Sequence, residues 1–143
     1  MTEHITLLGF DYGLRRIGVA VGESVTAGAR PLETLRCAAD GRVDWGGVER
    51  LIRDWQPDAL VVGRPTHADG TDTAITPLAE RFARQLHGRF GIPVHLVDEH
   101  LSSVEAERRL APAARKRARH DKQAVDMMAA TVILETWLSE HPK

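Results

Sequence analysis

The chain has 143 residues, with 19 Lys and Arg against 20 Asp and Glu and a formal net charge of −1. This length fits one compact domain, because domains commonly run from about 50 to 250 residues, so we expect residues 1–143 to form a single domain. A hydrophobic fraction of 43% with 27% charged residues excludes a disordered or fibrous protein. The near-neutral total argues against a protein that coats nucleic acid through bulk electrostatics.

The sequence also bears on the cellular compartment. No apolar run approaches the roughly 18 residues that a membrane span needs. The first four residues lack the basic-then-apolar layout of a secretion signal. The one cysteine, Cys37, cannot form a disulfide within the chain, which fits a reducing environment. We therefore expect a cytoplasmic protein with no membrane partner.

Two apolar runs near the start predict neighbouring strands. The first is Ile5–Phe10, which ends at Asp11, and the second is Ile17–Val21. The dipeptide Tyr12-Gly13 is typical of a turn and is predicted to connect them.

The middle of the chain predicts a strand, a helix and another strand. The third strand is expected over Thr26–Leu35, where Pro31 confines it to an edge or a break. Asp44 is placed to cap a helix with an apolar stripe at helical spacing, and this helix ends at Gln56-Pro57. A short buried strand follows at Ala59–Val62.

The remaining residues predict a helix after Thr73, a strand at Ile92–Val97 that runs into Asp98-Glu99, and two further helices. The first of these begins with capping-box spacing at Ser102–Glu105, and the last covers Asp121–Ser139. Hairpin-linked strands first and crossover strands later predict an α/β domain, with a mixed five-stranded sheet and helices on both faces.

Three acidic residues stand where a packed core disfavours them. Asp11 and Glu99 each follow an apolar strand, and strand ends are where the sites of open α/β sheets gather. Asp126 shares one face of the last helix with Ala130 and Ile133, and that face should lie on the sheet. If the three carboxylates meet, they raise one another's pKa unless a cation intervenes. A hard divalent ion, Mg²⁺ or Mn²⁺, suits these oxygen ligands.

Each acid also has a plain structural interpretation. Asp11 could be a turn or cap residue, because aspartate is common there. Glu99 could be a solvated acid that precedes a helix N-terminus, where acidic residues are favoured. Asp126 could pair with Lys122, one turn earlier on the same helix.

Positive charge is concentrated in one segment. Residues 108–122 carry seven Lys or Arg and one acid, a net +6, which leaves −7 for the remainder. Such a segment is suited to holding a phosphate backbone, although a solvated basic helix end and loop would have the same composition. The expected substrate-binding residues are Arg15, Arg16, Arg64, Arg115, Lys116, Arg117, Arg119 and Lys122.

Five sequence blocks, in order, resemble the YqgF family, also called RuvX, whose members are described as Holliday junction resolvases and pre-ribosomal-RNA nucleases. The blocks are Gly9–Gly13 with Arg16–Gly22, Ala29–Leu32, Leu60–Pro65 with Asp69-Gly70, Asp98–Ser103 with Glu105-Ala106, and Val125-Asp126 with Ala129-Ala130. The resemblance covers essentially the whole chain. It implies a ribonuclease H-like (RNase H-like) nuclease domain and carries the family's acidic triad onto Asp11, Glu99 and Asp126.

Four positions depart from the family pattern. His100 stands where the family usually has arginine, and Arg64 stands where it usually has leucine. Thr66-His67 replaces a usual leucine-asparagine pair. None of these changes removes an acid of the triad.

These observations predict a metal-dependent endonuclease that cleaves phosphodiester bonds in structured nucleic acid, with Asp11, Glu99 and Asp126 as both catalytic residues and ligands of Mg²⁺ or Mn²⁺. By resemblance, the expected activity is processing of the 5′ end of pre-16S ribosomal RNA in ribosome biogenesis, with ribosomal precursor particles as partners. The alternatives are a Holliday junction resolvase acting on branched DNA in recombination and repair, and a non-catalytic nucleic-acid-binding factor associated with transcription. A monomer and a homodimer both fit these patterns.

Overall fold

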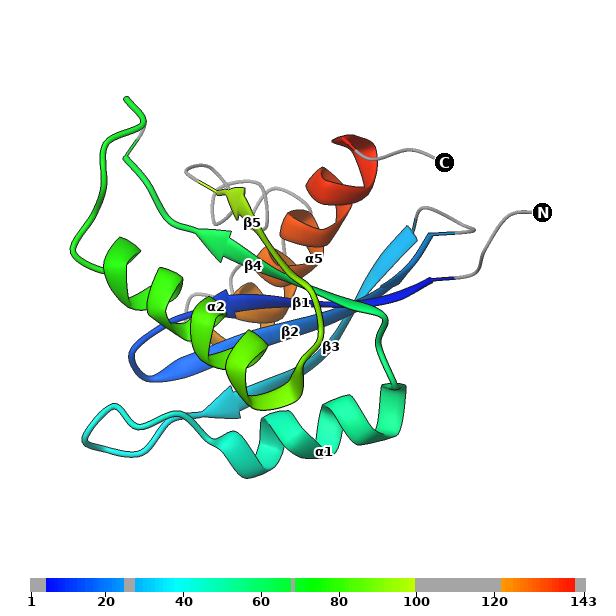
Figure 1. The fold of residues 1–143 in the computed structure, drawn as a ribbon. Helices are drawn as coiled ribbons and strands as arrows, with labels where there is room; N and C mark the ends of the chain where they lie inside the picture. The colour runs from blue at the N-terminus through cyan, green and yellow to red at the C-terminus, as the bar shows by residue number, and fades with distance from the viewer. Residues whose placement is uncertain (1–4, 25–27, 68, 100–121, 141–143) are drawn as a thin grey trace.

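The computed structural model describes residues 5–24, 28–67, 69–99 and 122–140. Its elements are shown in Figure 1 and are, in chain order, β1 (Thr6–Tyr12), β2 (Arg16–Glu23), β3 (Gly28–Arg36), α1 (Trp45–Trp55), β4 (Ala59–Arg64), α2 (Thr76–Phe90), β5 (Val94–Asp98) and α5 (Lys122–Glu140). None of the helices in these described ranges is long and apolar enough to cross a membrane.

The five strands form one mixed sheet in the order β3-β2-β1-β4-β5. The first three strands are antiparallel neighbours, because hairpins connect them, whereas β1, β4 and β5 run parallel through crossover connections. The predicted mixed five-stranded sheet is confirmed. It brings the C-terminal ends of β1 and β5 to the same end of the sheet, with β4 between them.

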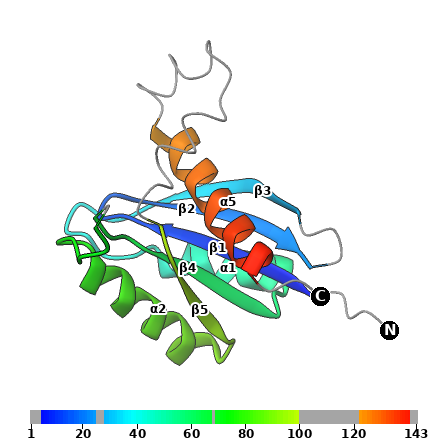
Figure 2. The same cartoon turned by 90° about the horizontal axis from the view of Figure 1, so that it is seen from above.

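Helices cover both faces of this sheet, as predicted. Figures 1 and 2 show α1 and α2 on one face and α5 on the other. Alternation along β1 separates the two cores: Leu8 and Phe10 pack on the side of α1 and α2, whereas Leu7 packs on the side of α5. All three side chains are fully buried.

Local signals in the sequence account for the ends of α1 and for the edge strand. The Asp44 side chain accepts a hydrogen bond from the backbone N–H of Gly47 at 3.0 Å, which confirms the predicted cap. The helix ends at Gln56 in a left-handed conformation. Pro31 lies in the edge strand β3, where Leu32 is an extra residue between the register partners of Val19 and Ala20. This is the bulged edge position that proline tolerates.

The first strand is longer than the sequence predicted. Asp11 and Tyr12 both pair within the β1–β2 ladder, so Asp11 lies inside the strand and the turn begins at Gly13. The predicted capping box at Ser102–Glu105 lies outside the described residues.

The position of α5 depends on glycines in the sheet beneath it. A Cβ atom on Gly18 would overlap the carbonyl oxygen of Asp126, and one on Gly9 would lie 2.5 Å from Cγ of Leu134. Ala130 is fully buried at the same contact. The backbone of α5 therefore rests directly on β2 at Gly18, and the side chain of Leu134 occupies the space over Gly9.

Candidate active site

The three predicted acids line one pocket of about 470 Å³ at the C-terminal end of the parallel strands. Asp11 comes from β1, Glu99 directly follows β5, and Asp126 lies in the first turns of α5. Arg15 and Arg16, at the β1–β2 turn, line the same pocket. Residues separated by more than 100 positions in the sequence are therefore brought to one end of the sheet.

Strand alternation and one register pairing place the acids together. Side chains alternate between the two faces along a strand. Asp11 therefore shares the face of Leu7 on β1, and Glu99 shares the face of Val97 on β5, and this face is covered by α5. Gly18 is the register partner of Asp11 and lies beneath Asp126. The glycine that lets α5 approach the sheet thus also brings Asp126 next to Asp11.

A second strand glycine makes room for Glu99. A Cβ atom on Gly63 would lie 2.7 Å from Cδ of Glu99. The backbone N–H of Glu99 donates to the carbonyl oxygen of Arg64 at 3.2 Å, which continues the β4–β5 ladder by one residue. Gly18 and Gly63 are not among the site residues predicted from the sequence, although an isolated glycine inside an apolar strand is a known sign of close approach.

Burial and mutual repulsion perturb two of the carboxyl groups. Desolvation raises the pKa of Asp11 to about 7, and the nearby charge of Asp126 adds to the shift. Desolvation also raises the pKa of Glu99 to about 9, reinforced by the charge of Asp11. A hydrogen bond between the two side chains favours the protonated form of Glu99 and the ionised form of Asp11. At neutral pH, the carboxyl group of Glu99 therefore stays protonated and donates a hydrogen bond to Asp11.

The third acid has a basic partner. Nε of Arg16 donates to Oδ2 of Asp126 at 2.7 Å, and the two side chains are only 26% and 22% exposed. Arg16 was predicted to bind substrate, whereas in this structure it balances the charge of Asp126. The alternative partner suggested by the sequence, Lys122, begins α5, but its side chain lies outside the described part of the chain.

The donor atoms suit a hard divalent cation, although they are not gathered around a single point. Within the described ranges, no group of three or more His, Cys, Asp and Glu side chains is arranged to hold a metal ion. Asp126 is turned to Arg16, while Asp11 and Glu99 share a proton. An all-oxygen set with two crowded carboxyls of raised pKa is nevertheless the chemistry that Mg²⁺ or Mn²⁺ stabilises, because a cation removes the cost of ionising both.

The raised pKa values predict that the protein without divalent ions loses stability as the pH rises. The ordinary pKa values of Asp11 and Glu99 are 3.8 and 4.5, whereas in the folded protein they reach about 7 and about 9. The folded state therefore binds more protons than the unfolded chain between these limits. This contribution to stability is fully present below about pH 4 and is lost as the pH rises through 7 and 9.

Thermal unfolding in EDTA between pH 5 and pH 9 measures this effect. The matched control is the double variant Asp11→Asn/Glu99→Gln, whose Tm should fall less steeply with pH because both titrating groups are absent. Parallel Tm profiles for the two proteins would contradict the assignment of the shared proton to this pair.

The other residues predicted to bind substrate lie in different surroundings. Arg64 donates to Asp72 at 2.6 Å, to Glu80 at 3.2 Å and to Asp98 at 3.4 Å. These residues lie on the side of α2, so a phosphate would have to compete with three carboxylates for the Arg64 guanidinium. Arg15 is exposed at the rim of the pocket. The remaining candidates, Arg115, Lys116, Arg117 and Arg119, lie outside the described residues. His100 lies outside them too.

Comparisons with known proteins identify sequence relatives along nearly the whole chain. The family model RuvX, described as Holliday junction resolvase, matches residues 5–140. A protein from Azotobacter vinelandii is 53% identical over 95% of this chain and 94% of its own length. A protein from Yersinia enterocolitica is 48% identical over 94% of this chain and 95% of its own length. Both carry the provisional name pre-16S rRNA nuclease.

Solved structures share the architecture at low sequence identity. RuvC from Thermus thermophilus, in complex with a Holliday junction substrate, matches with a TM-score of 0.58 and 16% identity over 96% of both chains. The fowlpox virus Holliday junction resolvase matches with a TM-score of 0.54 and 10% identity, over 96% of this chain and 99% of the other. At such identities the likeness concerns the fold, and the RNase H-like fold expected from the sequence is confirmed.

Proposed function

The chain belongs to the RuvX family, and on this basis we propose that it is a divalent-metal-dependent endonuclease that cleaves phosphodiester bonds in structured nucleic acid. The proposed substrate is the 5′ end of pre-16S ribosomal RNA, in line with the names of its relatives. The observation that carries the proposal is the convergence of Asp11, Glu99 and Asp126 in one pocket beside two arginines. Residues 1–143 would act as one nuclease domain.

The three acids would hold Mg²⁺ or Mn²⁺. The chemistry supplied by such an ion is neutralisation of charge on the phosphate and a lowered pKa for the attacking water. Metal binding would depend on the protonation of these acids. Glu99 must lose the proton of its hydrogen bond to Asp11 before both carboxylates can act as ligands.

Basic residues around the pocket would position the nucleic acid without reading its bases. Arg16 can exchange its Asp126 partner for a phosphate oxygen, since its guanidinium suits both anions. This exchange would release Asp126 toward the other two acids as the substrate binds. Arg15, at the exposed rim, would contact a neighbouring phosphate. Contacts from Arg115, Lys116, Arg117, Arg119 and Lys122 stay predictions from the sequence.

Cleavage of defined substrates by Asp126→Asn tests the proposal. With Mn²⁺, the unchanged protein should cleave a pre-16S 5′ leader RNA, and Asp126→Asn should lower this rate by about 10²-fold or more because a carboxylate oxygen ligand is lost. Asp54→Asn is the matched control, since Asp54 is exposed on α1 and lies outside the pocket. Undiminished cleavage by folded Asp126→Asn would remove this acid from the proposed site.

The same assay separates the alternatives. The family's description makes a four-way DNA junction the competing substrate. Faster cleavage of that junction than of the leader RNA would favour the resolvase, whose near-symmetric substrate suits a homodimer. Binding that survives EDTA, with no products from either substrate at any Mn²⁺ concentration, would favour the non-catalytic factor.

A further inference from the structure

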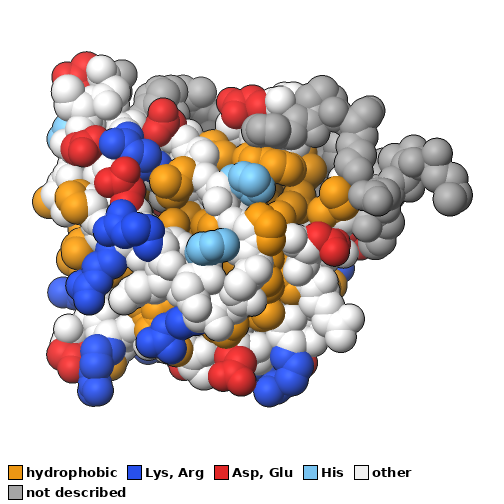
Figure 3. All heavy atoms as spheres, viewed as in Figure 1, with side chains coloured by type: hydrophobic (Ala, Val, Ile, Leu, Met, Phe, Trp, Pro, Cys, Tyr) orange, Lys and Arg blue, Asp and Glu red, His pale blue; other side chains and the backbone are white. Residues whose placement is uncertain are grey.

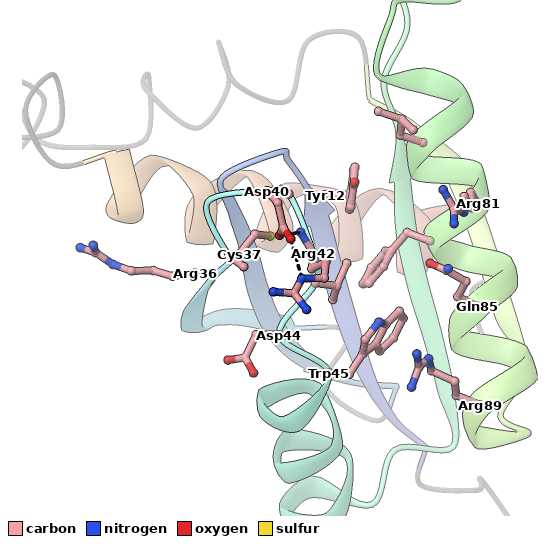
Figure 4. A pocket seen from close by; sticks show the side chains of 15 residues that line it. Tyr12, Arg36, Cys37, Asp40, Arg42, Asp44, Trp45, Arg81, Gln85 and Arg89 are labelled. Carbon is pink, nitrogen blue, oxygen red and sulfur yellow. Dashed lines mark hydrogen bonds and ion pairs between the residues drawn. The ribbon is translucent and has the colours of Figure 1, made fainter.

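A second and larger pocket lies on the opposite face of the sheet from α5. Its volume is about 830 Å³, and it is bounded by α2, by the start of α1 and by the segment between β3 and α1. Figure 4 shows Arg81, Gln85 and Arg89 projecting from α2 on one side, Trp45 from α1 below, and Tyr12 at the upper end. Neither the sequence prediction nor the proposed catalytic acids account for this pocket.

The pocket adjoins the candidate active site through Tyr12. Tyr12 lines both pockets and directly follows Asp11 in β1, so consecutive side chains of one strand face the two sites. From Tyr12, aromatic rings pack against one another beneath α2: Phe82 is buried in the hydrophobic core, whereas Tyr12 and Trp45 are half-buried and line the pocket. The ring centroids are 5.2 Å apart from Tyr12 to Phe82, 5.6 Å from Phe82 to Trp45 and 6.4 Å from Trp45 to Phe90.

Polar side chains of α2 line the pocket together with Tyr12 and Trp45. Arg81, Gln85 and Arg89 recur every four residues, so they share one face of the helix over a length of about 12 Å. The guanidinium carbon of Arg89 lies 4.0 Å from the centroid of the Trp45 ring. Basic side chains also gather over α2 in the space-filling view of Figure 3.

The acidic residues of the pocket are already engaged. Asp40 pairs with Arg42 at 2.7 Å, and Asp44 caps α1. Arginines outnumber acids in the lining, because Arg36 and Arg42 add to the two arginines of α2. The electrostatic balance therefore favours an anion, and the half-buried rings of Tyr12 and Trp45 favour a flat ring system beside it.

We propose that this pocket binds single-stranded nucleotides that flank the scissile phosphate, an inference that rests on the proposed function. Alternating phosphates and bases match a helix face with arginines at both ends beside the half-buried rings of Tyr12 and Trp45. The volume lies within the range of pockets that enclose small molecules, about 300–1,000 Å³, so it admits one or two unpaired nucleotides and excludes a duplex. Tyr12 links these nucleotides to the strand that enters the acidic site.

Binding of tailed and trimmed substrates in EDTA tests this inference without requiring cleavage. The probes are a fluorescent RNA hairpin with a four-nucleotide extension at its 5′ or 3′ end, the same hairpin without an extension, and a mononucleotide. One extension should tighten binding by about 10-fold, as expected for base stacking on aromatic rings with adjacent arginines. The double variant Arg81→Ala/Arg89→Ala should lose this gain.

The matched control is Arg53→Ala/Arg84→Ala, which removes the same charge from exposed positions outside the pocket. This control should keep most of the gain from the extension. Equal losses in the two double variants would overturn the inference in favour of general electrostatics. No gain from either extension, or a mononucleotide that binds as tightly as the tailed hairpin, would also overturn it.

Photocrosslinking locates the bound tail. A 4-thiouridine in the extension should crosslink to Tyr12, to Trp45 or to their neighbours in the pocket, and crosslinks confined to other surfaces would contradict the inference.

The outcome for this pocket is separable from the outcome for the proposed function. A protein that binds the extension but cleaves nothing would support the nucleotide-binding pocket and contradict the nuclease proposal. A protein that cleaves but gains nothing from the extension would support the nuclease proposal and contradict the nucleotide-binding pocket.

Discussion

Asp11→Asn is expected to lower nuclease activity by about 10³-fold while making the folded protein more stable. The activity should fall because Asp11 is the central acid of the pocket, hydrogen-bonded to Glu99 and close to the charge of Asp126. An amide keeps the size of the side chain but supplies no charge to a divalent cation. The same change removes the charge whose burial raises the pKa of Asp11.

The expected gain in stability is on the order of 1–2 kcal/mol at pH 8.5 in EDTA, or about 5 °C in Tm for a domain of this size. The gain should shrink toward pH 5, where the carboxyl of Asp11 is protonated and resembles the amide. Mn²⁺ should raise the Tm of the unchanged protein at pH 8.5 and raise that of Asp11→Asn much less. This trade of stability against activity is typical of catalytic sites built from crowded charges.

Three measurements on the same preparations decide this prediction: initial cleavage rates with Mn²⁺, Tm against pH in EDTA, and Tm against Mn²⁺ concentration. Asp54→Asn serves as the control, with unchanged rates and an unchanged response to Mn²⁺. A fully active Asp11→Asn would contradict the site. A variant that is inactive and also less stable at pH 8.5 would contradict the electrostatic account of the pocket.

Gly18→Ala is expected to destabilise the protein and to inactivate it by displacing α5. The added methyl group would overlap the carbonyl oxygen of Asp126, a backbone atom that cannot turn aside. Overpacking of this kind costs about 1–3 kcal/mol and more where a helix must move. Because Gly18 is the register partner of Asp11, the displacement falls at the end of α5 that carries Asp126.

Gly88→Ala is the matched control for Gly18→Ala. Gly88 lies in α2, and a Cβ atom there meets nothing within 4 Å. Alanine should therefore stabilise this helix by about 0.5–1 kcal/mol and leave cleavage unchanged. Urea denaturation measures both effects through the midpoint concentration. A Gly18→Ala protein with the stability and activity of the parent would show that α5 does not rest on β2 as the structure describes.

Much of this architecture follows from short-range patterns in the sequence. Short apolar runs predict β1 and β2, Asp44 predicts the start of α1, and Pro31 predicts an edge strand. Helical periodicity also places Asp126 on the same face as Ala130, which is buried against the sheet. These features are local, because backbone geometry determines which side chains share a face within one element.

The partners of the functional side chains required the tertiary structure. Arg16 and Asp126 are 110 positions apart, and their pairing depends on how α5 docks over β2. Arg64 meets three carboxylates because β4, β5 and α2 meet at that point. Alternation alone indicates that Arg64 and Asp98 lie on the opposite face from Asp11, but it does not identify these contacts.

The sequence by itself determined the strand pattern, the family resemblance and the three acids, since each is a property of residues read in order. Only the tertiary structure decided that Glu99 shares a proton with Asp11, that Arg16 neutralises Asp126, and that Tyr12 joins the acidic pocket to an arginine-lined one. The physical reason is that burial, desolvation and ion pairing depend on distances between elements. Those distances are set by strand register and by helix docking on glycines, which no periodicity within a single element encodes.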